Sequence, residues 1–392
     1  MEEDVKEIGL YIHIPFCKSK CYYCDFFSLS GKEKLQEKYV KSLEKEIIHY
    51  NIENKILNDH NIEKKYLIKT IYIGGGTPSL LDEIYMVNIM KTIKDNFNMA
   101  EDAEITIEVN PGTVTKEKLE TYIDIGINRI SIGLQSAQNE ILKNIGRIHT
   151  FEQFINTFKN ARQVGFKNIN VDLMIGLPEQ RMGDVEKSLK AILNLKPEHI
   201  SVYSLILEEG TELFRKVQNK EVEMISDTLE REMYWYVRNT LDKCNYIQYE
   251  ISNYARPGYE SKHNLDCWNQ KEYIGIGAGA SSFIDDIRFS NINNIEKYID
   301  NIENDQYSKN LILEERLNEE SKMNEYMMLG LRKLEGVNIL EFKNKFNQNP
   351  LAKYCKDLEK LNKDGLIKII DDSIMLTSRG IDFANLVWEH FV

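Results

Sequence analysis

Cys17-Lys18-Ser19-Lys20-Cys21-Tyr22-Tyr23-Cys24 places three thiols within eight residues, directly after an apolar run over residues 9–16 that reads as a β-strand. Three cysteines this close can hardly form a disulfide framework, but as thiolates they can converge on one metal centre. A structural zinc site usually takes four protein ligands, and no nearby CxxC or HxxxH pair completes one. Four-iron clusters are ordinarily held by four cysteine thiolates, so three would leave one iron open to another ligand.

Around this run, short apolar segments alternate with longer segments of helical period. We expect strands over residues 10–14, 70–73, 105–109, 129–134, 170–175 and 199–205. We expect helices over residues 33–50, 80–97, 116–125, 151–164 and 184–195. Repeated strand-then-helix units predict a parallel sheet with helices outside it, and about six units are too few for a closed eight-unit barrel.

Polar residues follow these strands at their carboxyl ends, where the functional residues of parallel barrels gather. The cysteine run follows the first strand, and Gly74-Gly75-Gly76-Thr77-Pro78 follows the second. Glu108 closes the third strand, Gln135 closes the fourth, and Asp172 lies in the fifth. These positions predict one site at one end of the sheet.

The spacing Cys17-x3-Cys21-x2-Cys24 resembles that of the radical S-adenosylmethionine (SAM) superfamily. Residues 11–17 and 24–26 resemble the group that contains oxygen-independent coproporphyrinogen III oxidase and the HemW-type heme chaperones. The resemblance implies an α/β fold, an open (β/α)6 partial barrel of the TIM type. It also implies a [4Fe–4S] cluster on Cys17, Cys21 and Cys24, with SAM chelating the fourth iron.

The resemblance further assigns residues to the SAM site. The glycine motif, with Gly75, Gly76 and Thr77, is expected at the amino group of SAM, and Glu108 at the ribose hydroxyls. The residues expected near the rest of SAM are Tyr11, Gln135, Arg147 and Asp172. Tyr22 and Tyr23 shield the cluster, stack on the adenine or only pack. Without the family, Glu108 is equally a solvated strand end, and the others are polar residues of a barrel rim.

His263-Asn264-Leu265-Asp266-Cys267-Trp268 resembles the HNxxYW signature of the same group, with Cys267 in place of the family's tyrosine. Imidazole and thiolate both ligate heme iron, so we predict His263 as a heme ligand near the barrel mouth and Cys267 as a weaker candidate. The alternative for His263 is a loop histidine at the polar surface. The glycine-alternating run over residues 273–282 is expected to pack closely near a ligand.

The composition predicts two domains joined by a linker. We expect the barrel over residues 1–290, a linker rich in Asn, Asp and Lys over 291–309, and a small α+β domain over 310–392. The last resembles a winged-helix module, with a hairpin of residues 366–370 and 374–376. It holds 12 Lys and Arg against 14 Asp and Glu, so we expect a cap over the barrel mouth and no nucleic-acid partner.

The charge and the cysteine usage bear on location. The net charge of −12 disfavours a general anionic partner. The remaining cysteines, Cys244, Cys267 and Cys355, are scattered, as expected in a reducing cytosol. The acidic N-terminus has no apolar signal core, and no apolar run reaches the length of a spanning helix. We expect a cytoplasmic protein, and peripheral contact with the inner face of the membrane stays open.

Two functions follow from the resemblance. One is a heme chaperone that delivers heme to acceptor proteins, membrane respiratory enzymes among them, and that needs an electron donor. The other is oxidative decarboxylation of coproporphyrinogen III to protoporphyrinogen IX. The oxidases have a further cysteine where Phe26 stands here, and a long segment before the cluster where only sixteen residues precede Cys17. We therefore expect the chaperone without oxidase activity; SAM cleavage, and another radical SAM reaction, stay open.

Overall fold

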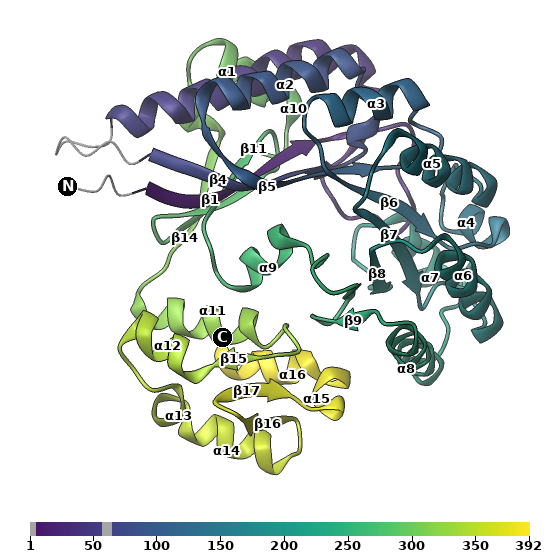
Figure 1. Ribbon diagram of the computed structural model, residues 1–392, viewed down its shortest axis with the longest axis vertical. Helices are drawn as coiled ribbons and strands as arrows, with labels where there is room; N and C mark the ends of the chain where they lie inside the picture. Colours follow the sequence, from purple (N-terminus) through teal and green to yellow (C-terminus); the bar gives the residue numbers. More distant parts are fainter. Residues whose placement is uncertain (1–4, 57–64) are drawn as a thin grey trace.

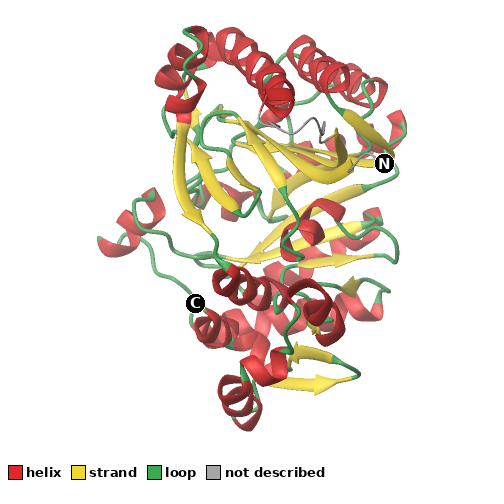
Figure 2. Cartoon of the chain, turned by 90° about the vertical axis from the view of Figure 1, so that its left-hand side faces the viewer, coloured by secondary structure: helices red, strands yellow, loops and turns green. Residues whose placement is uncertain are grey.

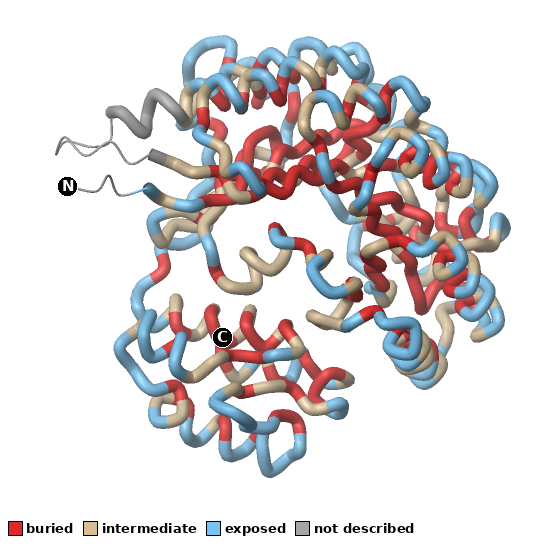
Figure 3. Tube along the Cα trace, viewed as in Figure 1, coloured by how far each residue is buried: buried red, intermediate tan, exposed pale blue. Residues whose placement is uncertain are grey.

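The computed structural model describes residues 5–56 and 65–392 of the chain. A twelve-stranded sheet curves through the larger domain, with helices on its outer side (Figures 1 and 2). Buried residues concentrate along the strands and the helix faces turned toward them (Figure 3). The strand order is β14-β13-β12-β11-β1-β4-β5-β6-β7-β8-β10-β9.

The six expected strands form the middle of this sheet as parallel neighbours, which confirms the open (β/α)6 partial barrel. They are β1 (Val5–Ile14), β4 (Lys65–Gly75), β5 (Asn98–Val109), β6 (Arg129–Gln135), β7 (Ile169–Ile175) and β8 (His199–Ser204). The first three begin earlier than expected. Their first residues pair with one another but are largely exposed in β1 and β5, so they lack the apolar pattern of a buried strand.

The expected helices are also present. They are α1 (Gln36–Ile56), α2 (Glu83–Asn96), α3 (Lys116–Asp124), α5 (Phe151–Val164) and α6 (Met182–Leu195). Helix α5 begins at a capping box, in which Thr150 and Gln153 each bond the other's backbone N–H, and it ends at Gly165 with φ of +114°. Further helices are α4 (Asn139–Asn144), α7 (Glu212–Gln218) and α8 (Asp227–Lys243). Among the described residues, no helix has both the length and the apolar character to cross a membrane.

Both edges of the barrel sheet carry strands that the periodicity did not predict. On one side lie β11 (Tyr273–Ile276), parallel to β1, and the antiparallel β12 (Ser281–Ile284), β13 (Ile287–Asn291) and β14 (Leu311–Arg316). On the other side lie β10 (Asn253–Ala255) and β9 (Ile247–Gln248). The glycine-alternating run thus forms β11 and the turn into β12. Its backbone packs closely, since a Cβ on Gly275 would lie 2.1 Å from the carbonyl oxygen of Ser281, while its expected place near a ligand stays a prediction.

The linker expected over residues 291–309 is instead a packed part of the larger domain. It contains α10 (Ile295–Glu303) and the 3-10 helix η3 (Tyr307–Asn310). Four apolar residues of α10 are buried, and Tyr298 donates a hydrogen bond to the buried carboxylate of Glu46 on α1. The polar composition of this segment describes only its outer face, because an amphipathic helix hides its apolar residues.

The C-terminal domain has the element order of a winged helix: a helix, a strand, further helices and a hairpin. Its elements are α11 (Glu319–Gly330), β15 (Val337–Asn338), α12 (Ile339–Phe346), α13 (Pro350–Lys353), α14 (Cys355–Lys363), β16 (Ile367–Ile370), β17 (Ser373–Leu376), α15 (Ser378–Asp382), α16 (Ala384–Trp388) and η4 (Glu389–Phe391). The predicted hairpin is β16–β17. The two-residue β15 completes its sheet and was too short to predict.

The C-terminal domain docks on α9 (Lys262–Trp268), which lies inside the curve of the sheet (Figure 1). The Arg332 guanidinium lies 4.5 Å from the ring centroid of Trp268 on α9 and 4.6 Å from that of Trp388 on α16. Backbone bonds join Ile251 to Arg332 and Leu334 to Tyr249. This domain was expected to cap the barrel mouth, but its contacts include α9, the segment beside β9 and β10, α8 through Trp235 with Asp382, and β13 through Arg288 with Glu325.

We predict that Arg332→Ala loosens this domain interface. The substitution removes a cation held between two aromatic rings and the nearby positive charge that opposes protonation of the buried Glu250. The free energy of unfolding should fall by about 2 kcal/mol in urea titrations. Arg379→Ala, at an exposed position of the same domain, should change it by less than about 0.5 kcal/mol. Equal effects of the two variants would contradict this account of the interface.

Candidate functional site

A cavity of about 390 Å³ lies at the carboxyl ends of the parallel strands. All three cysteines of the opening motif line it. Of the residues predicted around SAM, those that line it are Tyr23, Gly75, Gly76, Thr77, Glu108, Gln135, Arg147 and Asp172. Tyr11 and His263 are not among its lining residues. The tertiary structure therefore brings together residues from the ends of five strands, as the carboxyl-end rule predicts.

The cysteine loop is closed at its base by a short parallel pair, β2 (Phe16–Cys17) with β3 (Leu29–Ser30). The middle of the loop is joined by backbone hydrogen bonds to the end of α4 and to α7. The backbone N–H of Tyr22 donates to Ile145 O at 3.0 Å, and the Tyr22 carbonyl accepts from Leu213 N at 2.7 Å. These bonds fix the loop that carries the three cysteines against α4 and α7.

The two tyrosines of the loop have different environments. A Cβ on Gly146 would lie 2.8 Å from the Tyr22 ring, and the Lys216 ammonium lies 3.9 Å from the centroid of that ring. The Tyr22 side chain therefore packs against Gly146 and Lys216 and is not among the residues that line the cavity. Tyr23 lines the cavity and contacts a small apolar cluster that includes Met174 and Leu177. Only Tyr23 is placed to touch a ligand.

The glycine motif packs against the chain that leads into the cysteine loop. Gly75 has φ of +109°, and a Cβ there would lie 2.6 Å from the His13 ring. A Cβ on Gly76 would lie 2.8 Å from the carbonyl oxygen of Phe16. The His13 ring in turn bonds the Phe27 carbonyl at 2.8 Å, at the end of the loop. The glycine motif thus allows the cysteine loop to pack closely on the sheet, and it also lines the cavity.

Tyr11 was expected near SAM but lies beneath this layer. Its hydroxyl bonds His13 Nδ1 at 3.0 Å, and its ring lies 6.3 Å from that of Tyr72 on the neighbouring strand. Tyr72, rather than Tyr11, reaches the cavity. The two residues are paired in register on β1 and β4, so the sequence period alone could not decide which one would reach the cavity.

Glu108 is a half-buried carboxyl group that lines the cavity. Its Oε1 accepts from the Tyr72 hydroxyl at 2.8 Å, and its Oε2 accepts from Gly75 N at 3.2 Å. Burial raises the pKa of Glu108 to about 7, although both hydrogen bonds oppose the rise. A carboxylate held in this way can accept hydrogen bonds from ligand hydroxyls, and a solvated strand end is excluded.

Arg147 connects the cavity wall to the cysteine loop. Its Nη2 donates to Asn110 Oδ1 at 2.8 Å and to Gly133 O at 2.7 Å, and its Nη1 lies 3.7 Å from Cys21 Sγ. Asn110 donates onward to Thr77 Oγ1 at 2.8 Å, and Thr77 donates to Cys17 Sγ at 3.6 Å. This network directs a cation and a hydroxyl donor at two of the three sulfurs.

Gln135 and Asp172 also line the cavity. Gln135 has φ of +67°, an uncommon conformation for a residue other than glycine, and its buried amide oxygen has no hydrogen-bond partner in the described chain. Asp172 accepts from Asn170 at 2.7 Å and from Ser131 at 3.1 Å, and burial raises its pKa. Strain and unsatisfied polar groups of this kind cluster at functional sites.

Several lining residues were not predicted as site residues: Tyr72, Asn110, Ser131, Met174, Tyr203, Leu205, Ile206 and Glu208. Some of them could have been found from the period of two along the strands, because Ser131 shares a strand face with Gly133 and Gln135. Leu205 was expected inside the strand over residues 199–205 but follows the end of β8, and Ile206 and Glu208 lie in the same loop, where no strand or helix pattern was present.

The donor set fits a cluster with one open iron. Thiolates are the ligands that iron–sulfur clusters take, and the cavity lining holds three cysteines with no fourth cysteine and no histidine among the residues that the structure describes. Hydrogen bonds and positive charge near the sulfurs, as from Thr77 and Arg147, tune such clusters. The polar wall beyond them suits a small polar cofactor.

His263 is not at the mouth, which corrects its predicted placement. It lies on α9 with 7% of its surface exposed, and its Nδ1 is bonded to Thr70 Oγ1 at 2.8 Å. Cys267 lies on the same helix, where burial raises the pKa of its thiol to about 12, so it is poorly suited to supply a thiolate. The segment was read as a loop, but Ser261 caps a helix there.

Two exposed apolar residues stand at the edge of the cavity. Phe26, in the cysteine loop, is 66% exposed, and Ile206, after β8, is 70% exposed. Tyr203 is also exposed and lines the same cavity. We call Phe26, Tyr203 and Ile206 the apolar rim. Large apolar side chains left open at a cavity edge mark a binding surface more often than a stable free surface.

The sequence and the fold both have counterparts among known proteins. Residues 11–192 match the Radical SAM superfamily, and residues 317–383 match the HemN C-terminal domain. The heme chaperone HemW of Lactococcus lactis is 35% identical over 99% of this chain and 98% of its own length; that of Bacillus subtilis is 36% identical over 97% and 98%. Coproporphyrinogen III oxidase (HemN) from Escherichia coli has a similar fold, with a TM-score of 0.85 at 22% identity over 99% of this chain and 90% of its own.

We predict that Glu108→Gln changes how the stability of the cofactor-free protein depends on pH. The raised pKa means that folded wild type binds more protons than the unfolded chain between about pH 4.5 and 7, so its stability falls as pH rises through that window. The variant lacks this loss. Between pH 5.5 and 8, its free energy of unfolding should therefore gain about 2 kcal/mol relative to wild type in urea titrations.

Glu186→Gln, at an exposed position on α6, serves as the matched control and should follow the wild-type pH dependence. If Glu108→Gln also followed it, the carboxyl group would not be held at a raised pKa in the folded protein.

Proposed function

The chain belongs to the heme chaperone HemW family of the radical SAM superfamily, and from that premise we propose that it binds heme and transfers it to acceptor proteins. This proposal is supported by a cavity that brings three cysteines together with the carboxyl group of Glu108 and the guanidinium group of Arg147. We propose that Cys17, Cys21 and Cys24 hold a [4Fe–4S] cluster there.

In this proposal SAM is an exchangeable ligand of the same cavity. The cluster and SAM together supply one-electron chemistry, and the chain binds and orients them. Glu108 accepts hydrogen bonds from ribose hydroxyls. The backbone of Gly76 and the side chain of Thr77 lie at the amino group, and Tyr23, Gln135, Arg147 and Asp172 enclose the rest. The unsatisfied amide oxygen of Gln135 and its positive φ support a role in ligand binding.

Heme is proposed to bind against the apolar rim. The macrocycle is flat and apolar, and Phe26 and Ile206 present exposed apolar side chains from the cysteine loop and from the loop after β8. Lys20, exposed on the same loop and lining the cavity, supplies a cation for a propionate. Phe26 stands at the position of the additional oxidase cysteine, which supports heme binding over oxidase chemistry.

The proposed partners are heme-accepting proteins, with membrane respiratory enzymes among the candidates, and an electron donor for the cluster. The proposed location is the cytoplasm, with peripheral contact at the inner face of the membrane during transfer. The runner-up is coproporphyrinogen III oxidase activity, for which no observation in the structure speaks specifically.

We predict that Cys21→Ala abolishes reconstitution of the cluster. Two remaining thiolates cannot hold a four-iron cluster stably, so the brown chromophore and the bound iron and sulfide should be lost. Cys244→Ala, at an exposed free cysteine away from the cavity, should reconstitute as wild type does. A brown chromophore that survives substitution of Cys17, Cys21 and Cys24 together would contradict the cluster assignment.

We predict that Ile206→Asp weakens heme binding about tenfold or more, because it replaces apolar contact with a charge that heme binding must desolvate. An anaerobic absorbance titration with heme measures the effect. Ile369→Asp, at an isoleucine of the C-terminal domain that is 43% exposed, is the control and should bind heme as wild type does. Equal affinities would remove the rim from the proposal. Decarboxylation of coproporphyrinogen III over many turnovers by the reconstituted wild type would favour the oxidase instead.

A further inference from the structure

We infer that His263 is a positioning residue of the proposed SAM pocket, and not a ligand of heme iron: it holds Tyr72, and through Tyr72 it holds Glu108. The inference rests on the proposed function, because it names a further residue that acts on the same SAM site. It follows from how α9 is attached inside the barrel and from what the His263 ring touches there.

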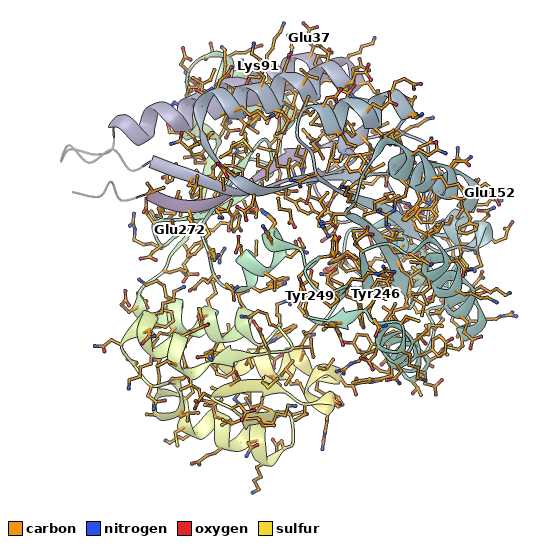
Figure 4. All side chains as sticks on the ribbon, in the orientation of Figure 1. Glu37, Lys91, Glu152, Tyr246, Tyr249 and Glu272 are labelled. Carbon is orange, nitrogen blue, oxygen red and sulfur yellow. The ribbon has the colours of Figure 1, made fainter. Side chains whose placement is uncertain are left out.

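Helix α9 is anchored to the sheet at its first turn. The Glu104 carboxylate on β5 accepts from the backbone N–H groups of Lys262 at 3.1 Å and of His263 at 3.2 Å. Tyr249, labelled in Figure 4, lies near the boundary of the two domains, and its hydroxyl accepts from the N–H of Ser261, the N-cap, at 3.2 Å. The helix therefore presents His263 to the inner face of β4 in a fixed orientation.

The His263 ring makes two contacts with β4. Its Nδ1 is bonded to Thr70 Oγ1 at 2.8 Å, and its ring stacks on Tyr72 with centroids 5.3 Å apart and planes 28° apart. Burial lowers the pKa of His263 to about 4, so the ring is neutral at neutral pH and is not a cation of the site. Thr70 and Tyr72 lie two residues apart and share a strand face.

Tyr72 links His263 to the cavity, because it contacts both His263 and Glu108. Its hydroxyl donates to Glu108 Oε1 at 2.8 Å, and both residues line the cavity. The Tyr72 ring also has Tyr11 as a neighbour on β1. The ring that carries the hydroxyl is therefore held from β1 and from α9, and removal of the His263 ring frees one side of it. A Tyr72 that can tilt gives Glu108 a hydrogen bond of poorer geometry, and a less fixed carboxylate binds ribose hydroxyls less well.

Ligation of heme iron by His263 would require a different arrangement. The ring is buried beneath the cavity and one nitrogen is already bonded to Thr70. To reach iron at the rim, α9 would have to leave Glu104, Thr70 and Tyr72, and also the Trp268–Arg332 contact that joins it to the C-terminal domain. The apolar rim lies elsewhere: Phe26 is in the cysteine loop after β1, Tyr203 is near the end of β8, and Ile206 is in the loop after β8.

The experiment uses the full chain, reconstituted anaerobically, and measures SAM affinity by calorimetric titration and heme affinity by absorbance titration. His263→Ala should weaken SAM binding about five- to tenfold, the effect of one lost or misaligned hydrogen bond, and leave heme affinity within about twofold of wild type. His263→Phe keeps a ring to stack on Tyr72 and should recover most of the SAM affinity. Lys271→Ala, exposed just beyond α9, is the control and should bind both ligands normally.

A double-mutant cycle tests the route through Tyr72. Tyr72→Phe should reproduce the loss of SAM affinity, and the double variant with His263→Ala should lose little more, because the two residues act on the same bond. If His263 has a merely structural role, the losses of SAM affinity in the two single variants should add up in the double variant. The thermal midpoint of unfolding should then fall in proportion to those losses. This result would overturn the inference. So would weakened heme binding or an altered heme spectrum in His263→Ala with unchanged SAM affinity.

The same titrations distinguish a failure of the proposed function from a failure of the inference about His263. If reconstituted wild type carries its cluster but binds no SAM, the proposed SAM pocket is wrong and the inference falls with it. If wild type binds SAM and His263→Ala binds it equally well, the inference alone falls. Should His263→Ala not fold, His263→Phe and Tyr72→Phe still decide the matter, since the inference requires the first to bind SAM nearly normally and the second weakly.

Discussion

The structure depends on the close approach of the glycine motif to the end of the first strand. A Cβ on Gly75 would overlap the His13 ring, and one on Gly76 would meet the Phe16 backbone. Because no side chain intervenes, His13 can hold the end of the cysteine loop through Phe27 O while Gly75 N bonds Glu108. One steric constraint therefore positions both the thiols and the carboxylate. A larger residue at Gly75 or Gly76 would push the cysteine loop away from the sheet.

Buried polar groups complete this arrangement. The network from Arg147 through Asn110 to Thr77 bonds residues of three strand ends to the cysteine loop. Buried networks of this kind are costly when a member is unsatisfied, so they hold one geometry when complete. Beside this network, the buried amide oxygen of Gln135 has no hydrogen-bond partner among the described residues, and the pKa of Glu108 is raised. Both residues line the cavity.

The second half of the chain shows where sequence patterns mislead. Residues 291–309 look like a polar linker, yet they bury an apolar helix face against α1 and extend the larger domain to β14. The segment with His263 looks like a loop at the mouth, yet it is a helix beneath the cavity that also carries the docking surface for the C-terminal domain. In both segments the polar residues of the sequence did not indicate which side chains are buried in contact with the rest of the domain.

Local sequence patterns were enough to predict the parallel sheet and its six central strands, because buried parallel strands are continuous apolar runs. The family resemblance added the open barrel and, with the rule that functional residues follow such strands, eleven of the residues that line the cavity. The spacing of Cys17, Cys21 and Cys24 determined the expected metal chemistry. Tertiary structure alone decided that Tyr72, and not Tyr11, reaches the cavity, that β11 joins the sheet beside β1, and that His263 faces β4. These outcomes depend on contacts between segments about 190 to 260 residues apart in the chain, such as Thr70 with His263 and Gly9 with Tyr273, which no local period encodes.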